Sequence, residues 1–563
     1  MKPLFQKEIK IKSLFAYKKF LKKGCHLVPK MSIRLTEDFQ SSRETKGATK
    51  KKILRIFKKA KAIRKLDVSG LLVLNTRFWF STFLYIAKKA NSVFDLKTHE
   101  LRVMAAEEKD LVVSWPKYMK NLRSLFSEVI ADFGWIDDYK EKRKPVNDYL
   151  KYLPKLENIE IKFFHNTLPF DLDGVWKFQT YPSSIKKIHF TEAKNGDKPI
   201  NGSMAHLKNL KDLRFGFRIR NDNSMNTLKS VLNLLPQVPQ LEALDIDFLD
   251  FFKIDASVCA ALKSLFKLRK VKFSIWSENE GANLQKILKS LEDCPLEDVD
   301  LKVDLDSDRV VSLVRDFIEK KSGLKSLNLQ LLKYHIFKSS KEIENLLKTI
   351  DDLPLLISFC FVAKTTLIYD IGPKNILPEI GFPFKKLFGS SRSTPLKKFR
   401  ISMNQHNFGK SGFIKLLESM NEISPILEDL QIDLGKYEPQ DINMILGFLN
   451  NLRNIRFLKL DSLGVSSKSF FFELIEAIEN LKCLREFSLG EVSENVKRRS
   501  YFDGVERILL KNGLETFNCE VSEELKKILG DSFSLDSEEI SMKNPFLKKG
   551  PGFKENQGFW SKI

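Results

Sequence analysis

Histidine and cysteine, the side chains that most often bind metals or act as nucleophiles, are few and widely scattered in this sequence. The 563 residues include seven histidines and six cysteines. No H-x-x-x-H, H-E-x-x-H or C-x-x-C spacing occurs, although zinc sites commonly use such pairs. The G-x-S-x-G turn of serine hydrolases is also absent. The sequence therefore predicts no metal site, no cofactor and no enzymatic activity.

One segment has the composition of a phosphate-binding loop. Residues 408–413 read FGKSGF, and a Gly-Lys-Ser sequence can hold phosphates with its backbone N–H groups. That loop also requires a glycine five residues before Gly409, and the residue there is Asn404. We therefore expect no nucleotide site and no small-molecule substrate.

Positive charge is concentrated at the N-terminus. Residues 1–65 contain 21 Lys and Arg against 4 Asp and Glu, which is +17 of the total net charge of +23. A basic segment of this density can bind nucleic acid or an anionic membrane, or can serve as a nuclear import signal. The candidate basic-arm residues are Lys50, Lys51, Lys52, Arg55, Lys58, Lys59, Lys61, Arg64 and Lys65. An alternative is that residues 1–35, with Glu8 as their one acidic residue, form a cleaved mitochondrial presequence.

The rest of the chain is organised by a short apolar phrase of the form L-x-x-φ-x-φ, where φ is apolar. Between 395 and 490 its middle apolar residue recurs at 399, 430, 458 and 487, at intervals of 31, 28 and 29. Between 159 and 327 the intervals are 25 to 31. The φ-x-φ pair predicts a short strand with one buried face, and the residues between phrases have apolar side chains at helical spacing. Units of this size bury their apolar faces by stacking on one another.

This pattern resembles the leucine-rich repeat family, in particular the longer, helix-containing subtype typified by ribonuclease inhibitor. The resemblance implies an α/β solenoid of horseshoe shape, with parallel strands on the concave face and helices on the convex face. The family's asparagine after the second strand leucine is matched by Asn404 but by few other repeats. We expect a basic arm at 1–60, partly disordered or an amphipathic helix, the solenoid at 61–525 and a flexible tail at 526–563.

The interval from 327 to 399 is too long for one or two units. We expect Leu355, Ile357 and Phe359 to supply a strand there, and residues 371–395, rich in Pro and Gly, to form an irregular insertion that is either a binding element or a spacer. A segment at 71–87 is apolar but contains Arg77, so no transmembrane helix is expected.

Charged residues alternate with the apolar residues of the predicted strands. Successive strands present acidic and basic residues in turn, whereas a surface that binds a nucleic acid duplex is uniformly positive. A surface of mixed charge suits a protein partner. The candidate partner-binding residues are Asp245, Asp247, Lys270, Lys272, Asp298, Asp300, Lys398, Arg400, Asp429 and Asp433.

The sequence thus favours a non-enzymatic scaffold or adaptor that binds a protein partner on the concave face of the repeats. The alternative functions are a nuclear or nucleic-acid-associated factor tethered by the basic arm, and a mitochondrial protein. Scattered cysteines without paired spacing are typical of a reducing compartment, so we expect the cytoplasm or the nucleus, with the mitochondrion as the alternative.

Overall fold

The computed structural model describes the chain in segments, and they form two compact units. Unit 1 comprises Met1–Ser274 with Asp293–Pro295, and unit 2 comprises Ile275–Glu292 with Leu296–Ile563. Each unit is considered by itself. The described residues are 8–11, 31–35, 63–67, 84–88, 93–99, 115–129, 150–163, 178–193, 202–217, 225–248, 254–275, 281–304, 308–332, 340–364, 384, 386–389, 394–403, 416–433, 442–460, 463, 465, 467–492, 516–521 and 539–543.

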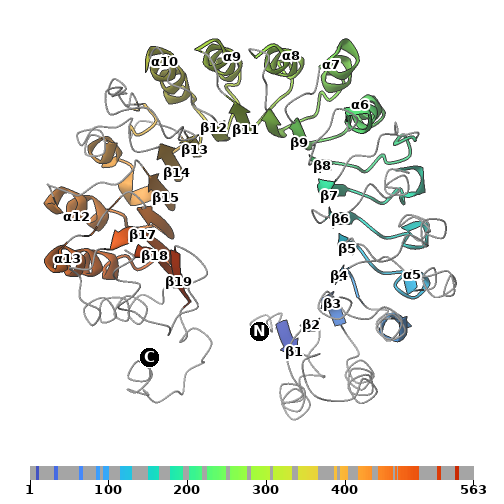
Figure 1. The fold of residues 1–563 in the computed structure, drawn as a ribbon, viewed down its shortest axis with the longest axis horizontal. Coiled ribbons are helices and arrows are strands. Elements are labelled where there is room, and N and C mark those ends of the chain that lie inside the picture. Colours follow the sequence, from blue (N-terminus) through green and yellow to red (C-terminus); the bar gives the residue numbers. More distant parts are fainter. Residues whose placement is uncertain are drawn as a thin grey trace, which may run out of the picture. The chain divides into compact units, whose positions relative to one another are not determined.

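Unit 1 is a sheet in which neighbouring strands are parallel and follow one another in chain order (Figure 1). Parallel neighbours need a crossover connection, so each strand and the segment after it form one repeat. The strands are β1 (Glu8–Ile11), β2 (Met31–Leu35), β3 (Ile63–Asp67), β4 (Asp95–His99), β5 (Ser124–Val129), β6 (Asn158–Phe163), β7 (Lys187–Ala193), β8 (Asp212–Phe217), β9 (Ala243–Phe248) and β10 (Lys270–Ile275).

Unit 2 has the same arrangement and ends differently. Its strands pair in parallel up to β18, and β18 then pairs with β19 in the antiparallel direction. An antiparallel last strand covers the edge that a parallel series would leave open. The strands are β11 (Asp298–Asp304), β12 (Ser326–Leu332), β13 (Ser358–Lys364), β14 (Lys398–Met403), β15 (Asp429–Asp433), β16 (Phe457–Leu460), β17 (Glu486–Val492), β18 (Thr516–Val521) and β19 (Glu539–Lys543).

Helices connect the strands, and within each unit they lie on one face of the sheet (Figure 1). We call the opposite face of the sheet the strand face. Unit 1 has α5 (Trp115–Tyr118), η7 (Phe178–Thr180), α6 (Met225–Leu234), η9 (Leu235–Gln237), α7 (Ala256–Lys263) and a short helix at 84–88. Unit 2 has α8 (Ala282–Ser290), α9 (Asp308–Glu319), α10 (Ser340–Asp351), η10 (Ser424–Ile426), α12 (Ile442–Asn450), α13 (Lys468–Glu479) and a short helix at 416–420.

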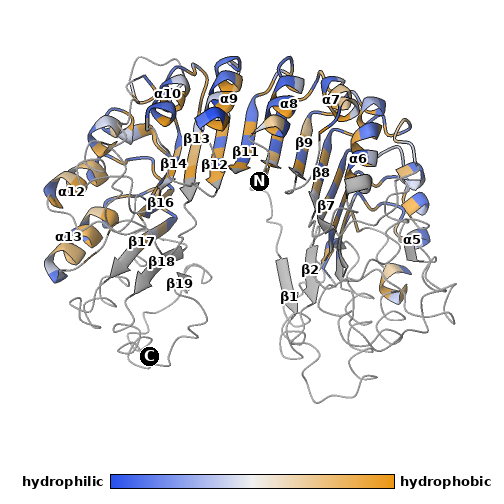
Figure 2. Ribbon diagram, turned by 45° about the horizontal axis from the view of Figure 1, so that its top comes forward, coloured by the Kyte–Doolittle hydropathy of each residue, from blue (hydrophilic) through white to orange (hydrophobic). Residues whose placement is uncertain are grey.

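The middle apolar residue of each phrase forms a continuous buried row beneath the sheet. Strand alternation places it on the helical side, and each contributes roughly 1.5–3 kcal/mol of burial free energy. Figure 2 shows the resulting apolar bands along the strands and the apolar stripes of the helices. In unit 1 the middle residues, each at most 3% exposed, are Leu66, Leu96, Leu125, Ile159, Ile188, Leu213, Leu244 and Val271. In unit 2 they are Val299, Leu327, Phe359, Phe399, Leu430, Leu458 and Phe487.

A repeated pair of backbone hydrogen bonds joins most neighbouring described repeats within each unit. The carbonyl two residues before the middle residue accepts from two consecutive N–H groups of the following repeat. Glu157 O, for example, accepts from Lys186 N at 2.7 Å and from Lys187 N at 3.0 Å. The same pattern recurs at Lys397 O, which accepts from Glu428 N and Asp429 N. This link holds neighbouring strands in the same register that the buried middle residues require.

The expected α/β leucine-rich repeat architecture is confirmed in each unit, but one strand was assigned in the wrong register. The prediction expected Leu355, Ile357 and Phe359 to supply this strand, whereas β13 begins at Ser358 and contains only Phe359 of the three. Leu355 is instead 38% exposed, and Leu356, Phe359 and Phe361 are buried. The segment LISFCF matches the phrase better than the one chosen, because Leu356 precedes Phe359 by the required three residues.

Ordered strands also occur where the sequence predicted an arm and a tail. β1 and β2 lie within residues 1–60 and pair in parallel, so Glu8–Ile11 is a strand and not part of a helix. β2 continues the pairing to β3. β19 lies within residues 526–563. The physical reason at the N-terminus is visible in the register, since Ile9 pairs with Ile33 and Ile33 with Leu66, as middle residues do elsewhere.

The described part of the 371–395 insertion belongs to the core. Phe384, Leu387 and Phe388 are at most 1% exposed, so they are not available to a partner. Phe384 and Phe388 lie 6.0 and 5.2 Å from the ring of Phe399 in β14, in edge-on arrangements. The carboxylate of Asp351 at the end of α10 accepts hydrogen bonds from the backbone N–H groups of Lys386 and Leu387. The segment therefore fills the space beside β14 that helices fill in other repeats.

Candidate functional site

The charged residues predicted to bind a partner lie on the strand face, within each unit. Residues next to the buried middle position alternate with it, so they point away from the helices. In unit 1, Asp245 and Lys272 follow the middle residues of β9 and β10, and Lys270 precedes that of β10. In unit 2 the corresponding residues are Asp298, Asp300, Lys398, Arg400, Asp429 and Asp433. Asp247 lies in β9, and its side chain is outside the described part.

Several of these residues already have partners within the protein. Lys272 Nζ lies 3.5 Å from Asp245 Oδ2. Arg400 donates two hydrogen bonds to Asp429, with Nε 3.2 Å from Oδ1, and Ser402 donates to Asp433 at 2.8 Å. Asp429 is only 5% exposed. These pairs tie neighbouring strands together, so their charges are less available to a partner than the sequence indicated.

The Arg400–Asp429 pair lies next to Cys360, whose thiol pKa is set mainly by burial and to a smaller extent by the Arg400 charge. The hydrogen bond from Arg400 to Asp429 raises the pKa of the guanidinium against the opposing effect of burial. Cys360 pairs with Arg400 across β13 and β14. Burial raises the pKa of the Cys360 thiol to about 11, and the nearby Arg400 charge only partly offsets this. At neutral pH the thiol is protonated, which makes it a poor nucleophile.

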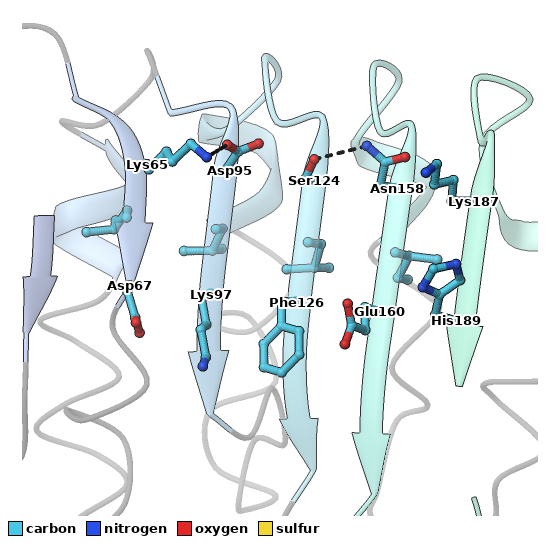
Figure 3. Close-up of a pocket in the computed structure, with 14 residues that line it drawn as sticks. Lys65, Asp67, Asp95, Lys97, Ser124, Phe126, Asn158, Glu160, Lys187 and His189 are labelled. Atoms are coloured by element: carbon cyan, nitrogen blue, oxygen red, sulfur yellow. Dashed lines mark hydrogen bonds and ion pairs between the residues drawn. The ribbon is translucent and has the colours of Figure 1, made fainter. Parts of the chain in front are cut away.

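A shallow groove of about 480 Å³ crosses the strand face of unit 1 from β3 to β7 (Figure 3). Its walls are the side chains on either side of the middle residue of each strand. The polar and aromatic lining residues are Lys65, Asp67, Asp95, Lys97, Ser124, Phe126, Asn158, Glu160, Lys187 and His189. The groove lies closer to the N-terminus than any of the residues predicted to bind a partner.

Polar pairs occupy the row of residues that precede the middle position. Lys65 Nζ lies 3.3 Å from Asp95 Oδ2, and Asn158 donates to Ser124 Oγ at 3.1 Å. Both pairs join neighbouring strands (Figure 3). Because each pair is partly solvent-exposed, it contributes little to stability, but it holds its side chains in place along the groove.

Asp212 in β8 anchors a denser charge cluster at the end of the groove. Its side chain is 9% exposed and lies 3.2 Å from His189 Nε2, 3.1 Å from Arg214 Nε and 3.7 Å from Lys187 Nζ. Burial alone raises the pKa of Asp212, but the hydrogen bonds from His189 and Arg214 outweigh burial and lower it to about 2. The cluster therefore keeps a buried carboxylate ionised and compensated.

Three side chains at the centre of the groove form no ion pair with another described residue. Lys97, Phe126 and Glu160 occupy the position after the middle residue in β4, β5 and β6, and are direct Cα partners. The Lys97 ammonium lies 4.7 Å from the centroid of the Phe126 ring. Among the described residues, neither Lys97 nor Glu160 has an ion-pair partner. Figure 3 shows the three side by side on adjacent strands.

Lys97, Phe126 and Glu160 were not predicted as site residues, because β4 and β5 have a polar residue in the last position of the apolar phrase. In β4 the phrase reads V-x-x-L-x-T at Val93, Leu96 and Thr98, and in β5 it reads L-x-x-L-x-S at Leu122, Leu125 and Ser127. The usable signal was the buried pair three residues apart: Val93 and Leu96 are at most 2% exposed, as are Leu122 and Leu125.

Two residues predicted to belong to the free basic arm are part of the sheet. Arg64 lies over the ring of Phe94 at 4.8 Å, and Lys65 pairs with Asp95. Both come from β3. The other candidate arm residues, Lys50 to Lys61, lie outside the described residues. Their proposed roles stay predictions.

Within the described segments, no three His, Cys, Asp or Glu side chains are grouped so that they could hold a metal ion. No helix within those segments combines the length and the apolar character needed to cross a membrane.

Known proteins were compared with this chain by sequence and by structure. No family model matches the chain, and no curated protein matches it. Among solved structures, a leucine-rich repeat protein of Leptospira interrogans matches with 14% identity and a TM-score of 0.31, covering 83% of this chain and 97% of that chain. The repeated strand-and-helix architecture is seen in this chain's own strand register and buried rows.

Proposed function

We propose that this chain of leucine-rich repeats is a non-enzymatic binding scaffold that holds a protein partner on the strand face of unit 1. The observation that carries the proposal is the groove across β3–β7, whose centre presents an ammonium, an aromatic ring and a carboxylate that form no ion pair with any described residue. Preformed grooves with a few polar groups around an apolar element are typical of recognition sites.

The charge of the strand face supports a protein partner over a nucleic acid. The residues flanking the middle positions of β3 to β10 include six Lys or Arg and five Asp or Glu. Phosphate recognition depends on neutralising negative charge with an excess of cations, and this face has an excess of one. The basic segment before β3 keeps its predicted role as an electrostatic tether or import signal, which is a separate proposal about residues outside the groove.

The proposal is tested by affinity capture with the full-length chain. Lys97→Glu reverses one charge at the centre of the groove, and Lys263→Glu makes the same change on an exposed residue of α7. Captures are made in the presence of nuclease, and both variants are first checked for native circular dichroism. Partners lost with Lys97→Glu and kept with Lys263→Glu support the proposal. An identical set of partners for both variants and the unaltered chain would refute it.

A further inference from the structure

Most charges on the strand face of unit 1 are used to join strands. Lys65 is paired with Asp95, and Asp212 is surrounded by Lys187, His189 and Arg214. A partner that engaged these groups would have to break existing interactions. The groups that a partner can engage without that loss are Lys97 and Glu160, since neither has an ion-pair partner among the described residues.

The carboxylate of Glu160 is half-buried and has no ion pair with a cationic side chain among the described residues. It is half-buried in the row that follows the middle residues, between Phe126 of β5 and His189 of β7. Its charge acts on Arg214, two strands away, without an ion pair. A half-buried carboxylate gains from a cation brought by a partner, because partial desolvation strengthens the attraction.

Lys97 and Phe126 form the other half of the site. The ammonium lies against the ring, 4.7 Å from its centroid, so the ring orients it. Lys97 is half-buried, and its Cα partner on the other side is Asp67 of β3. The three groups are in register on adjacent parallel strands. Neighbouring strands lie about 4.8 Å apart, so the backbones of Lys97 and Glu160 are separated by about 10 Å with Phe126 at the midpoint.

From this arrangement we infer that the groove binds an extended peptide segment of a partner protein that carries an acidic and a basic side chain three residues apart, with an apolar residue between them. The inference rests on the proposed function and specifies the partner's chemistry. In an extended polyproline-like chain, residues i and i+3 point to the same side and lie about 9.3 Å apart, which matches the spacing of Lys97 and Glu160. The acidic side chain lies at Lys97 and the basic one at Glu160. The apolar residue between them is turned about 120° from that side, so it meets the flank of the Phe126 ring.

The experiment is a selection from a random peptide display library with the full-length chain as bait. The unaltered chain is expected to enrich an acidic and a basic residue at positions i and i+3 around an apolar residue. Glu160→Lys makes both ends of the site basic, so it should enrich two acidic residues at the same spacing. Lys97→Glu should enrich two basic residues. Lys263→Glu, on α7, should enrich the same peptides as the unaltered chain.

The binding affinities of the selected peptides test the inference quantitatively. A peptide from the unaltered chain should bind Lys97→Glu and Glu160→Lys roughly 5-fold more weakly or worse, because a partly exposed ion pair contributes up to about that factor and the reversal adds repulsion. Phe126→Ala, introduced into each of the three baits, should weaken the binding of the peptides that each bait selected to a similar extent. It removes the shared apolar contact without changing the charges.

The outcomes separate this inference from the proposed function. Enriched peptides without the charge pair, or a motif unaffected by Glu160→Lys, would overturn the inference and leave the groove as a binding site. No enrichment at all, together with cellular partners that depend on Lys97, would also overturn it, because the groove would then bind a folded surface. No enrichment and no Lys97-dependent partner would overturn both.

Discussion

The ionised carboxylate of Asp212 should make unit 1 sensitive to acid, and the size of the effect can be worked out. Its pKa is lowered from 3.8 to about 2 by His189 and Arg214, which outweigh burial. One pKa unit corresponds to about 1.4 kcal/mol, so this lowering stabilises the folded state by about 2.4 kcal/mol at neutral pH. The group is largely enclosed, with 9% of its side chain exposed, so little of this is lost to solvent screening.

The lowered pKa of Asp212 determines how the stability of the folded state changes with pH. A folded-state pKa below the unfolded one gives stability that is fully present above about pH 4 and is lost as the pH falls through about 2. About half of the contribution, roughly 1.3 kcal/mol, should remain at pH 3. Asp212→Asn removes the titrating group, so the free-energy difference between the two proteins should shrink by about 1 kcal/mol from pH 7 to pH 3.

The assay is urea unfolding followed by circular dichroism at pH 7, 5, 4 and 3. Asp95→Asn is the matched control, because Asp95 occupies the same row and pairs with Lys65 but has 39% of its side chain exposed. It should change the free energy of unfolding by less than about 1 kcal/mol. A difference for Asp212→Asn that is the same at pH 7 and pH 3 would show that the side chain acts by packing alone, and the electrostatic reasoning would be wrong.

Three further predictions concern groups with defined surroundings. Phe388→Ala should lower the free energy of unfolding by about 3–5 kcal/mol in chemical denaturation, because its ring is 1% exposed, whereas Phe266→Ala, at a ring that is 60% exposed, should cost less than about 1 kcal/mol; equal costs would contradict the core role of residues 384–389. Lys321→Met should cost about 2–4 kcal/mol, because the buried ammonium donates to two backbone carbonyls after α8 that would lose their donor; an unchanged urea midpoint would count against that role. Iodoacetamide at pH 8 should label the exposed Cys483 and leave Cys360, whose pKa is raised to about 11 by burial, largely unmodified in peptide mass mapping; rapid labelling of Cys360 would rule out the buried thiol.

The repeat fold could be predicted from the sequence because it depends on spacing. The middle residues Leu213, Leu244 and Leu327 pair in the structure as their intervals require. The prediction failed where spacing was ambiguous. LLISFCF offers two apolar residues, Leu355 and Leu356, for one buried position; simple alternation with Phe359 favours Leu355, whereas the three-residue spacing of the phrase selects Leu356, which is the buried one.

The site was less predictable, because availability of a charge depends on its surroundings. Arg400 and Asp429 have the residue types of an interface, yet they are paired with each other. Lys97 and Glu160 look no different in the sequence, yet among the described residues neither forms an ion pair, although Asp67 is the Cα partner of Lys97 in β3. Which of several charged residues has a partner follows from three-dimensional register, which single-sequence patterns of alternation do not resolve.

The double backbone hydrogen bond between repeats separates what builds this protein from what it recognises. The two N–H groups that bind each carbonyl belong to the residues immediately before the middle position, such as Lys211 and Asp212 or Arg456 and Phe457. Any amino acid except proline supplies such a group, and none of the residues at these described joints is proline. Strand-face side chains can therefore be exchanged without loss of these backbone links, and the cost to folding then depends on the side chain's own contacts, as it does at Asp212. A new binding preference would need new substituents on an unchanged framework.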